Sequence, residues 1–161
     1  MNPPAIHNAA FWAKVDNLRA ELAEGVSPDL AYSDEWSSFD DTVSSNGSTP
    51  LDTALASADE YMYEASVRAG GKGTTAFESG ARNCHRVALV LLRADARTAV
   101  YPWATNISDP YVRRVLGAGG FKRYERAHLT ALTATFAPKI PALPTDAVRV
   151  VVAFCFHVGY Y

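Results

Sequence analysis

The sequence predicts a mainly α-helical protein: a bundle of four to five helices followed by a C-terminal β-strand or extended segment. Apolar residues recur at intervals of three and four along several segments, which is typical of amphipathic helices. These segments are bounded by helix-start residues and by glycines. The end of the chain differs, because it is rich in Val and Phe, which favour strands. With 161 residues, 48% of them apolar, the chain can bury a substantial core, and we expect one domain over 1–161.

The first half of the chain predicts one long helix and one long loop. The first helix is expected from about Pro4 to Glu24, and Gly25 is expected to end it. Its apolar stripe consists of Phe11, Val15, Leu18 and Leu22. Residues 33–49 are acidic and rich in Ser and Gly, which predicts a loop of unusual length. Loops of this length are often functional.

Two further helices are expected in the middle of the chain. Thr49 precedes a proline and marks a strong helix start, with Gly70 as the stop. Thr75 and Glu78 have the spacing of a capping box, which predicts a third helix from there to about Ala96.

The remaining segments are harder to assign. Asp109 precedes a proline and predicts a short helix to about Leu116. Residues 121–136 have helical apolar spacing, but the Thr-rich part within them is also compatible with an extended strand. Residues 137–161 are expected to be a Pro-rich linker and a C-terminal strand. Because a single strand is not stable alone, it must pair within the chain or with another copy.

Charge is distributed unevenly along the chain. Residues 1–78 contain 13 Asp and Glu against 4 Lys and Arg, whereas residues 79–128 contain 9 Lys and Arg against 3 Asp and Glu. The whole chain nevertheless has a net charge of −2, so it has no overall attraction for nucleic acid. Such polarity predicts a basic binding face, or subunits that meet acidic half to basic half.

The most informative pattern is a row of four arginines on the third expected helix, Arg82, Arg86, Arg93 and Arg97. At about 100° per residue they project within roughly 60° of one another, opposite an apolar face. Like charges at this spacing repel, so the row favours an anion beside it. Further basic residues follow, with aromatic residues interleaved: Arg113, Arg114, Lys122, Arg123 and Arg126, with Tyr101, Trp103, Phe121 and Tyr124.

Three interpretations of these basic residues remain open. They are phosphate contact with a nucleic acid, with the aromatic rings stacking on bases; pairing with the acidic half of the chain or of a neighbour; and plain solvation, with Glu78 pairing to Arg82. A subunit interface is expected from the acidic clusters and from the apolar end of the chain: Asp34, Glu35, Asp40, Asp41, Asp59, Glu60, Phe154, Phe156, Tyr160 and Tyr161.

Other chemistry finds little support in the sequence. Cys84 lies on an apolar helix face and cannot pair with the adjacent His85, because neighbours on a helix diverge by about 100°. The four histidines are scattered without metal-ligand spacing, so we expect no metal, no cofactor and no enzyme activity. No apolar run spans a bilayer, and the N-terminus lacks the pattern of a signal peptide, so we expect neither a membrane association nor secretion.

These features predict a self-assembling structural protein that packages nucleic acid, a viral coat subunit forming a filament or shell in a host cytoplasm. Its partners would be copies of itself and a nucleic acid, with single-stranded RNA preferred. One alternative is a small oligomeric nucleic-acid-binding regulator that uses residues 109–132 as a helix-turn-helix-like hairpin. A second is an enzyme with an unrecognised pocket near His128.

Overall fold

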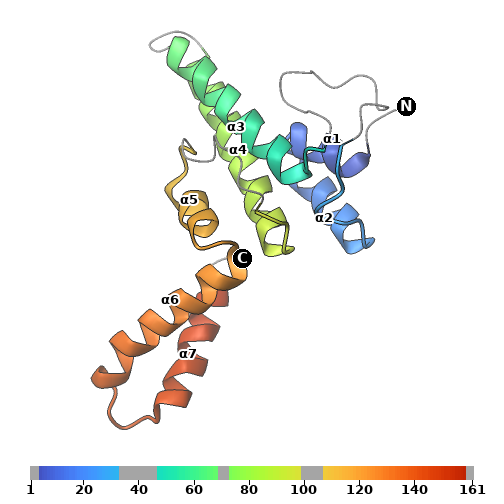
Figure 1. The fold of residues 1–161 in the computed structure, drawn as a ribbon. Helices are drawn as coiled ribbons and strands as arrows, with labels where there is room; N and C mark the ends of the chain where they lie inside the picture. The colour runs from blue at the N-terminus through green and yellow to red at the C-terminus, as the bar shows by residue number, and fades with distance from the viewer. Residues whose placement is uncertain (1–3, 33–46, 69–72, 99–106, 159–161) are drawn as a thin grey trace.

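The computed structural model describes residues 4–32, 47–68, 73–98 and 107–158, with side chains of the last helix as far as Phe154. In these residues the protein is mainly helical, with seven α-helices and no strand. Figure 1 shows their arrangement: α1 to α5 pack together, and α6 and α7 form a hairpin that projects away from them.

The long first helix predicted from the sequence is in fact two helices, α1 (Ala5–Phe11) and α2 (Val15–Ala23). Ala13 lies between them with a φ of 52°, in the left-handed region. The N–H of Lys14 donates to the carbonyl of Ala9 and closes α1 with a Schellman motif. The break lets both helices bury apolar residues in one core, which a single straight helix does not allow.

Helix α3 (Pro50–Val67) begins where the sequence predicted. The hydroxyl of Thr49 accepts from the N–H of Asp52, and the Asp52 carboxylate accepts from the N–H of Thr49, at 3.3 and 2.6 Å. Just before it, two backbone hydrogen bonds join Tyr32 to Gly47 and Ser48, so the described residues that flank 33–46 lie side by side. That segment, most of the predicted acidic loop, lies outside the described residues.

Helix α4 (Thr74–Arg93) confirms the third predicted helix, but the predicted capping box is wrong. Gly73 occupies the N-cap in a left-handed conformation, so Thr75 lies inside the helix. The hydroxyl of Thr74 donates to the carbonyl of Arg68 at the end of α3. The start of α4 is therefore set by the turn from α3 and not by its own side-chain cap.

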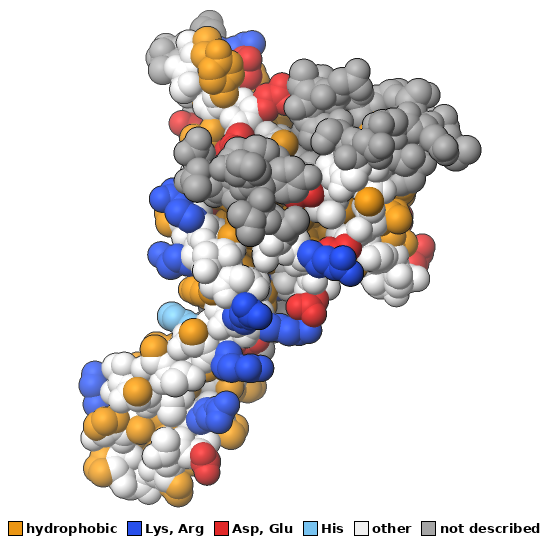
Figure 2. All heavy atoms as spheres, viewed as in Figure 1, with side chains coloured by type: hydrophobic (Ala, Val, Ile, Leu, Met, Phe, Trp, Pro, Cys, Tyr) orange, Lys and Arg blue, Asp and Glu red, His pale blue; other side chains and the backbone are white. Residues whose placement is uncertain are grey.

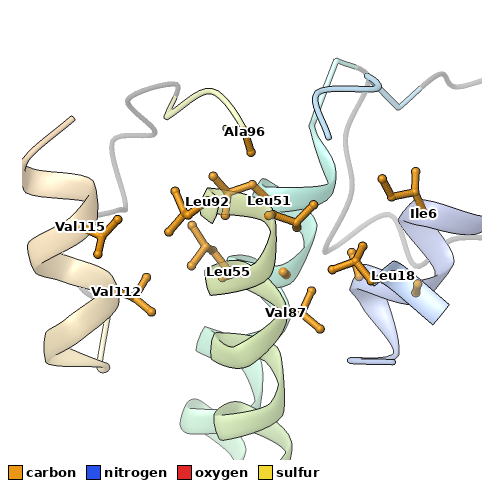
Figure 3. Close-up of a cluster of buried hydrophobic side chains, with 14 of the residues drawn as sticks. Ile6, Leu18, Leu51, Leu55, Val87, Leu92, Ala96, Val112 and Val115 are labelled. Atoms are coloured by element: carbon orange, nitrogen blue, oxygen red, sulfur yellow. The ribbon is translucent and has the colours of Figure 1, made fainter. Parts of the chain in front are cut away.

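The core lies where α1 to α5 meet (Figure 3). Ile6 and Leu18 enter it from α1 and α2, and α3 and α4 cross it as its central pair. Helix α5 (Pro110–Gly117) covers the other side of α4 with Val112 and Val115, both fully buried. Its predicted start is confirmed, because Asp109 accepts from the N–H groups of Tyr111 and Val112.

Helix α6 (Phe121–Phe136) resolves the ambiguous segment as a helix. Three of its threonines donate their hydroxyls to the carbonyl four residues earlier, which satisfies these polar groups within the helix: Thr130, Thr133 and Thr135. A short 3-10 helix, η2 (Ala137–Lys139), then leads into the last turn before α7.

The predicted C-terminal strand is wrong, because residues 145–158 form helix α7 (Thr145–Val158). Val148 and Val152, four residues apart, are buried, and α7 packs against α6. Packing of this i,i+4 pair on a neighbouring helix outweighs the strand preference of Val, since that preference is weak and depends on context. Of the helices described, none is long and apolar enough to cross a membrane.

Candidate nucleic-acid interface

Helix α4 carries three of the four arginines in the predicted row, Arg82, Arg86 and Arg93. Their spacing places them within about 40° around the helix and along about 16 Å of its length. Arg82 and Arg86 are exposed, whereas Arg93 is half-buried with its guanidinium 5.4 Å from the centre of the Phe121 ring. The row thus runs along α4 and ends against the first turn of α6.

Arg97 does not belong to this row, and the prediction that it does is wrong. Asp95, with a φ of 71°, ends the helix, and the N–H of Ala96 donates to the carbonyl of Leu91. Beyond that turn, Nε of Arg97 lies 3.4 Å from Oδ2 of Asp29, and its N–H donates to Oδ1. Arg97 therefore joins the end of α4 to the turn after α2.

Two other predicted basic residues are engaged within the chain. The guanidinium of Arg113 donates twice to the carbonyl of Ile107, at 3.1 and 2.7 Å, and so holds the segment that enters α5. Nζ of Lys122 lies 2.6 Å from the Asp95 carboxylate and joins the start of α6 to the end of α4. Of the three residues engaged within the chain, only Arg97 pairs with the acidic half, as one of the three interpretations predicted; Arg113 and Lys122 bind acceptors outside that half.

Five of the nine candidates have no ion pair or side-chain hydrogen bond within the part of the chain that the structure describes, and all five are exposed: Arg82, Arg86, Arg114, Arg123 and Arg126. The predicted pair between Glu78 and Arg82 is not among the ion pairs of the described residues. Figure 2 shows Lys and Arg side chains following one another over α5 and the beginning of α6. We call these five residues the unpaired arginines.

The aromatic residues near them serve packing. Tyr124 lies edge-on to Tyr111, with ring centroids 5.5 Å apart, and its ring stacks on His128 at 5.6 Å. Phe121 lies beneath Arg93. Phe121 and Tyr124 could stack on bases, as predicted, only by giving up these contacts inside the chain. Tyr101 and Trp103 lie outside the described residues.

Few of the predicted interface residues fall where the structure describes them. Glu60 is exposed on α3, whereas Asp59 is half-buried, and burial raises the pKa of its carboxyl. Phe154 on α7 is 69% exposed. The others lie outside the described residues or side chains: Asp34, Glu35, Asp40, Asp41, Phe156, Tyr160 and Tyr161.

The buried polar groups of α4 are structural. Cys84 is fully buried, and burial raises the pKa of its thiol to about 12, so it is unreactive at neutral pH. His85 is also buried, and burial lowers its pKa against the opposing charge of Asp109. Across the described residues, no group of three His, Cys, Asp or Glu side chains is placed to hold a metal ion.

One feature escaped the sequence entirely. A cleft of about 200 Å³ lies between the end of α1, the middle of α3 and the start of α4. Its aromatic and acidic lining comes from segments up to 66 residues apart, Phe11 to Phe77. The only local signal is the i,i+4 spacing of Glu60 and Glu64, which by itself indicates just one face of a helix.

The described residues thus define a helical protein with unpaired arginines on α4 to α6 and a projecting α6–α7 hairpin. No family model, curated protein or solved structure matches the chain.

Proposed function

We propose that the chain is a self-assembling structural protein that packages single-stranded RNA, as the coat subunit of a virion assembled in a host cytoplasm. The observation that carries the proposal is the α6–α7 hairpin. It bears unpaired arginines at its base and exposed apolar side chains along its length. One surface suits phosphate, and the other suits a second subunit.

The basic part of the proposal rests on the unpaired arginines. Arg97, Arg113 and Lys122 are held by acceptors of the same chain, whereas the unpaired arginines have no ion pair or side-chain hydrogen bond among the described residues. Each unpaired guanidinium can neutralise one phosphate and release its counterion. Because these contacts would be to phosphate alone, the protein would bind RNA with little dependence on base sequence.

The assembly part rests on the outer face of α7. Val150, Val151 and Phe154 are 69%, 52% and 69% exposed. Their spacing places Val150 and Phe154 opposite the buried Val148 and Val152, with Val151 on the flank of that face. Exposed apolar side chains that gather in this way mark an interaction surface, although α7 also carries the exposed Asp146 and Arg149.

The end of α6 and the turn that follows it carry further exposed apolar residues: Phe136, Ile140 and Leu143. Together the six exposed side chains would supply part of the roughly 800 Å² per partner that a standard interface buries. The same face on a second copy supplies the matching apolar surface, and the acidic and basic halves of neighbouring copies would add complementary charge.

The proposal is tested by the size of the purified protein. We expect light scattering and electron micrographs to show filaments or shells that form or lengthen when single-stranded RNA is added. Phe154→Glu is expected to abolish assembly, because it places a charge in the apolar interface. Val67→Glu is the matched control, since Val67 is 64% exposed but lies on α3, and it should assemble normally.

A stable monomer or dimer at every salt concentration and pH, with or without RNA, would contradict the coat-subunit proposal. Equal loss of assembly in both variants would contradict the role of α7.

One observation favours the regulator as a second candidate. Helices α5 and α6 are joined by the three residues 118–120, and α6 presents Arg123 and Arg126 in its first turns, as a recognition helix would. Binding to randomised duplex DNA followed by selection separates the two candidates. A regulator yields a defined sequence motif, whereas a packaging protein yields none.

A further inference from the structure

The cleft between α1, α3 and α4 has a composition typical of cation recognition. Four aromatic side chains line it, together with two carboxylates from α3: Phe11, Trp12, Tyr61 and Phe77, with Glu60 and Glu64. Aromatic faces attract cations through their quadrupole, most strongly where water is partly excluded. The ring centroids of Phe11 and Trp12 are 4.8 Å apart, and those of Tyr61 and Phe77 are 6.3 Å apart.

The protein already binds one guanidinium at this wall. The guanidinium carbon of Arg68 lies 4.7 Å from the centre of the Phe77 ring, and its Nε lies 2.9 Å from Oε2 of Glu64. An aromatic ring and a carboxylate thus hold a guanidinium in the way this lining predicts. Arg68 neutralises Glu64, and Glu60 is then the carboxylate of the cleft without an ion pair among the described residues.

Two groups in the rest of the cleft are accessible to a ligand, and a third is a buried hydroxyl without a hydrogen-bond partner. Glu60 is exposed and has no partner among the described residues. Trp12 is 58% exposed, although a large apolar side chain is normally covered. Ser57 is 3% exposed, and its hydroxyl has no hydrogen-bond partner in the described structure, which is unusual for a buried polar group.

We propose that this cleft binds a single guanidinium or alkylammonium group, the side-chain chemistry of Arg or Lys, between the aromatic rings and Glu60. One positive charge matches the Glu60 carboxylate, and the cleft volume suits a side chain. The group has two possible sources, a free small cation or a basic side chain of a second copy. This inference does not depend on RNA packaging.

The test uses N-acetyl-arginine amide as the probe and the full chain as the receptor, with calorimetry or amide NMR shifts as the readout. N-acetyl-citrulline amide is the matched probe, because it has nearly the same shape without the charge. We expect saturable binding of the arginine probe and at least tenfold weaker binding of the citrulline probe. Binding of both probes with equal affinity, or of neither, would overturn the proposal.

Variants then locate the site. Trp12→Ala and Glu60→Gln should each weaken binding about fivefold or more, since each removes one attractive group from an exposed position. Glu24→Gln, which removes an exposed carboxylate at the end of α2, should leave binding unchanged. Circular dichroism checks that each variant folds. Undiminished binding by folded Trp12→Ala and Glu60→Gln would also overturn the site.

Sedimentation with and without the probe separates the two sources. If a second copy supplies the cation, the arginine probe lowers self-association of the wild type but not of the Trp12→Ala variant. If a free cation is the ligand, the probe binds while self-association is unchanged. Both results support the cleft, and neither depends on the outcome of the Phe154→Glu assembly test.

Discussion

Ala13 and Asp95 are the two described residues other than glycine that adopt a left-handed backbone conformation. Each ends a helix, α1 and α4, where glycine is the usual residue. The Cβ atom makes this conformation unfavourable by about 1–2 kcal/mol. Both positions therefore hold local strain, which the surrounding core stabilises.

Ala13→Gly should raise the free energy of unfolding by about 0.5–1 kcal/mol. Glycine relieves the backbone strain, and this gain exceeds the loss that comes from the greater conformational freedom of glycine in the unfolded chain. Urea denaturation followed by circular dichroism measures the change.

Ala20→Gly is the control, since Ala20 is exposed within α2. The same replacement there should lower stability by about 1 kcal/mol. A decrease at Ala13 as large as that at Ala20 would contradict the assignment of strain.

The buried histidines predict how stability depends on pH. Burial lowers the pKa of both His7 and His85 below its unfolded value of about 6.5, so the unfolded chain binds more protons near that pH. The contribution of these two histidines to the free energy of unfolding is complete above pH 6.5 and is lost as the pH falls below that value.

We therefore expect the urea midpoint to decrease between pH 7.5 and pH 5. His85→Gln should make the decrease in the urea midpoint between pH 7.5 and pH 5 smaller, whatever the stability of the variant at pH 7.5. A midpoint independent of pH over this range would contradict the prediction.

Among the elements, α3 and α4 pack closely at Gly80. A Cβ atom at Gly80 would lie 2.9 Å from two carbons of the Tyr61 ring, and that ring also lines the cleft. Because Gly80 has no side chain, the Tyr61 ring of α3 can lie directly against α4.

Gly80→Ala should lower stability by about 1–3 kcal/mol, although alanine is the better helix former, because the ring has to move. It should also weaken binding of the arginine probe. Gly117→Ala is the control, because a Cβ atom there meets nothing within 4 Å. If Gly80→Ala were as stable as wild type, the close packing of α3 on α4 would be refuted.

At the scale of the whole molecule, the basic residues divide into those paired within the chain and those left unpaired. Only the unpaired arginines are expected to contact RNA phosphates. The logarithm of affinity for single-stranded RNA should fall with the logarithm of salt concentration by about 0.7 for each phosphate neutralised.

Arg86→Gln should therefore reduce the salt slope by about 0.7, as measured by fluorescence anisotropy on a labelled single-stranded RNA. Arg97→Gln is matched in charge but removes a side chain held by Asp29, and it should leave the slope unchanged. Equal reductions in the two variants would contradict the division into paired and unpaired residues.

Local sequence patterns were enough to predict the mainly helical class, the starts of α3 and α5, and the concentration of positive charge in residues 79–128. These features depend on residues close together in the chain, through apolar spacing, proline and side-chain caps. For the same reason the burial of Cys84 was predicted correctly.

Packing between distant segments set the break at Ala13, the helix at Thr145–Val158, and the pairing of Arg97. In each case the deciding contact joins distant residues: two helices enter one core, Val148 and Val152 pack on α6, and Asp29 reaches Arg97 across 68 positions. The cleft is the extreme example, because its lining exists only once α1, α3 and α4 have packed. Local preferences are weak, around 1 kcal/mol per residue, and burial against a distant element exceeds them.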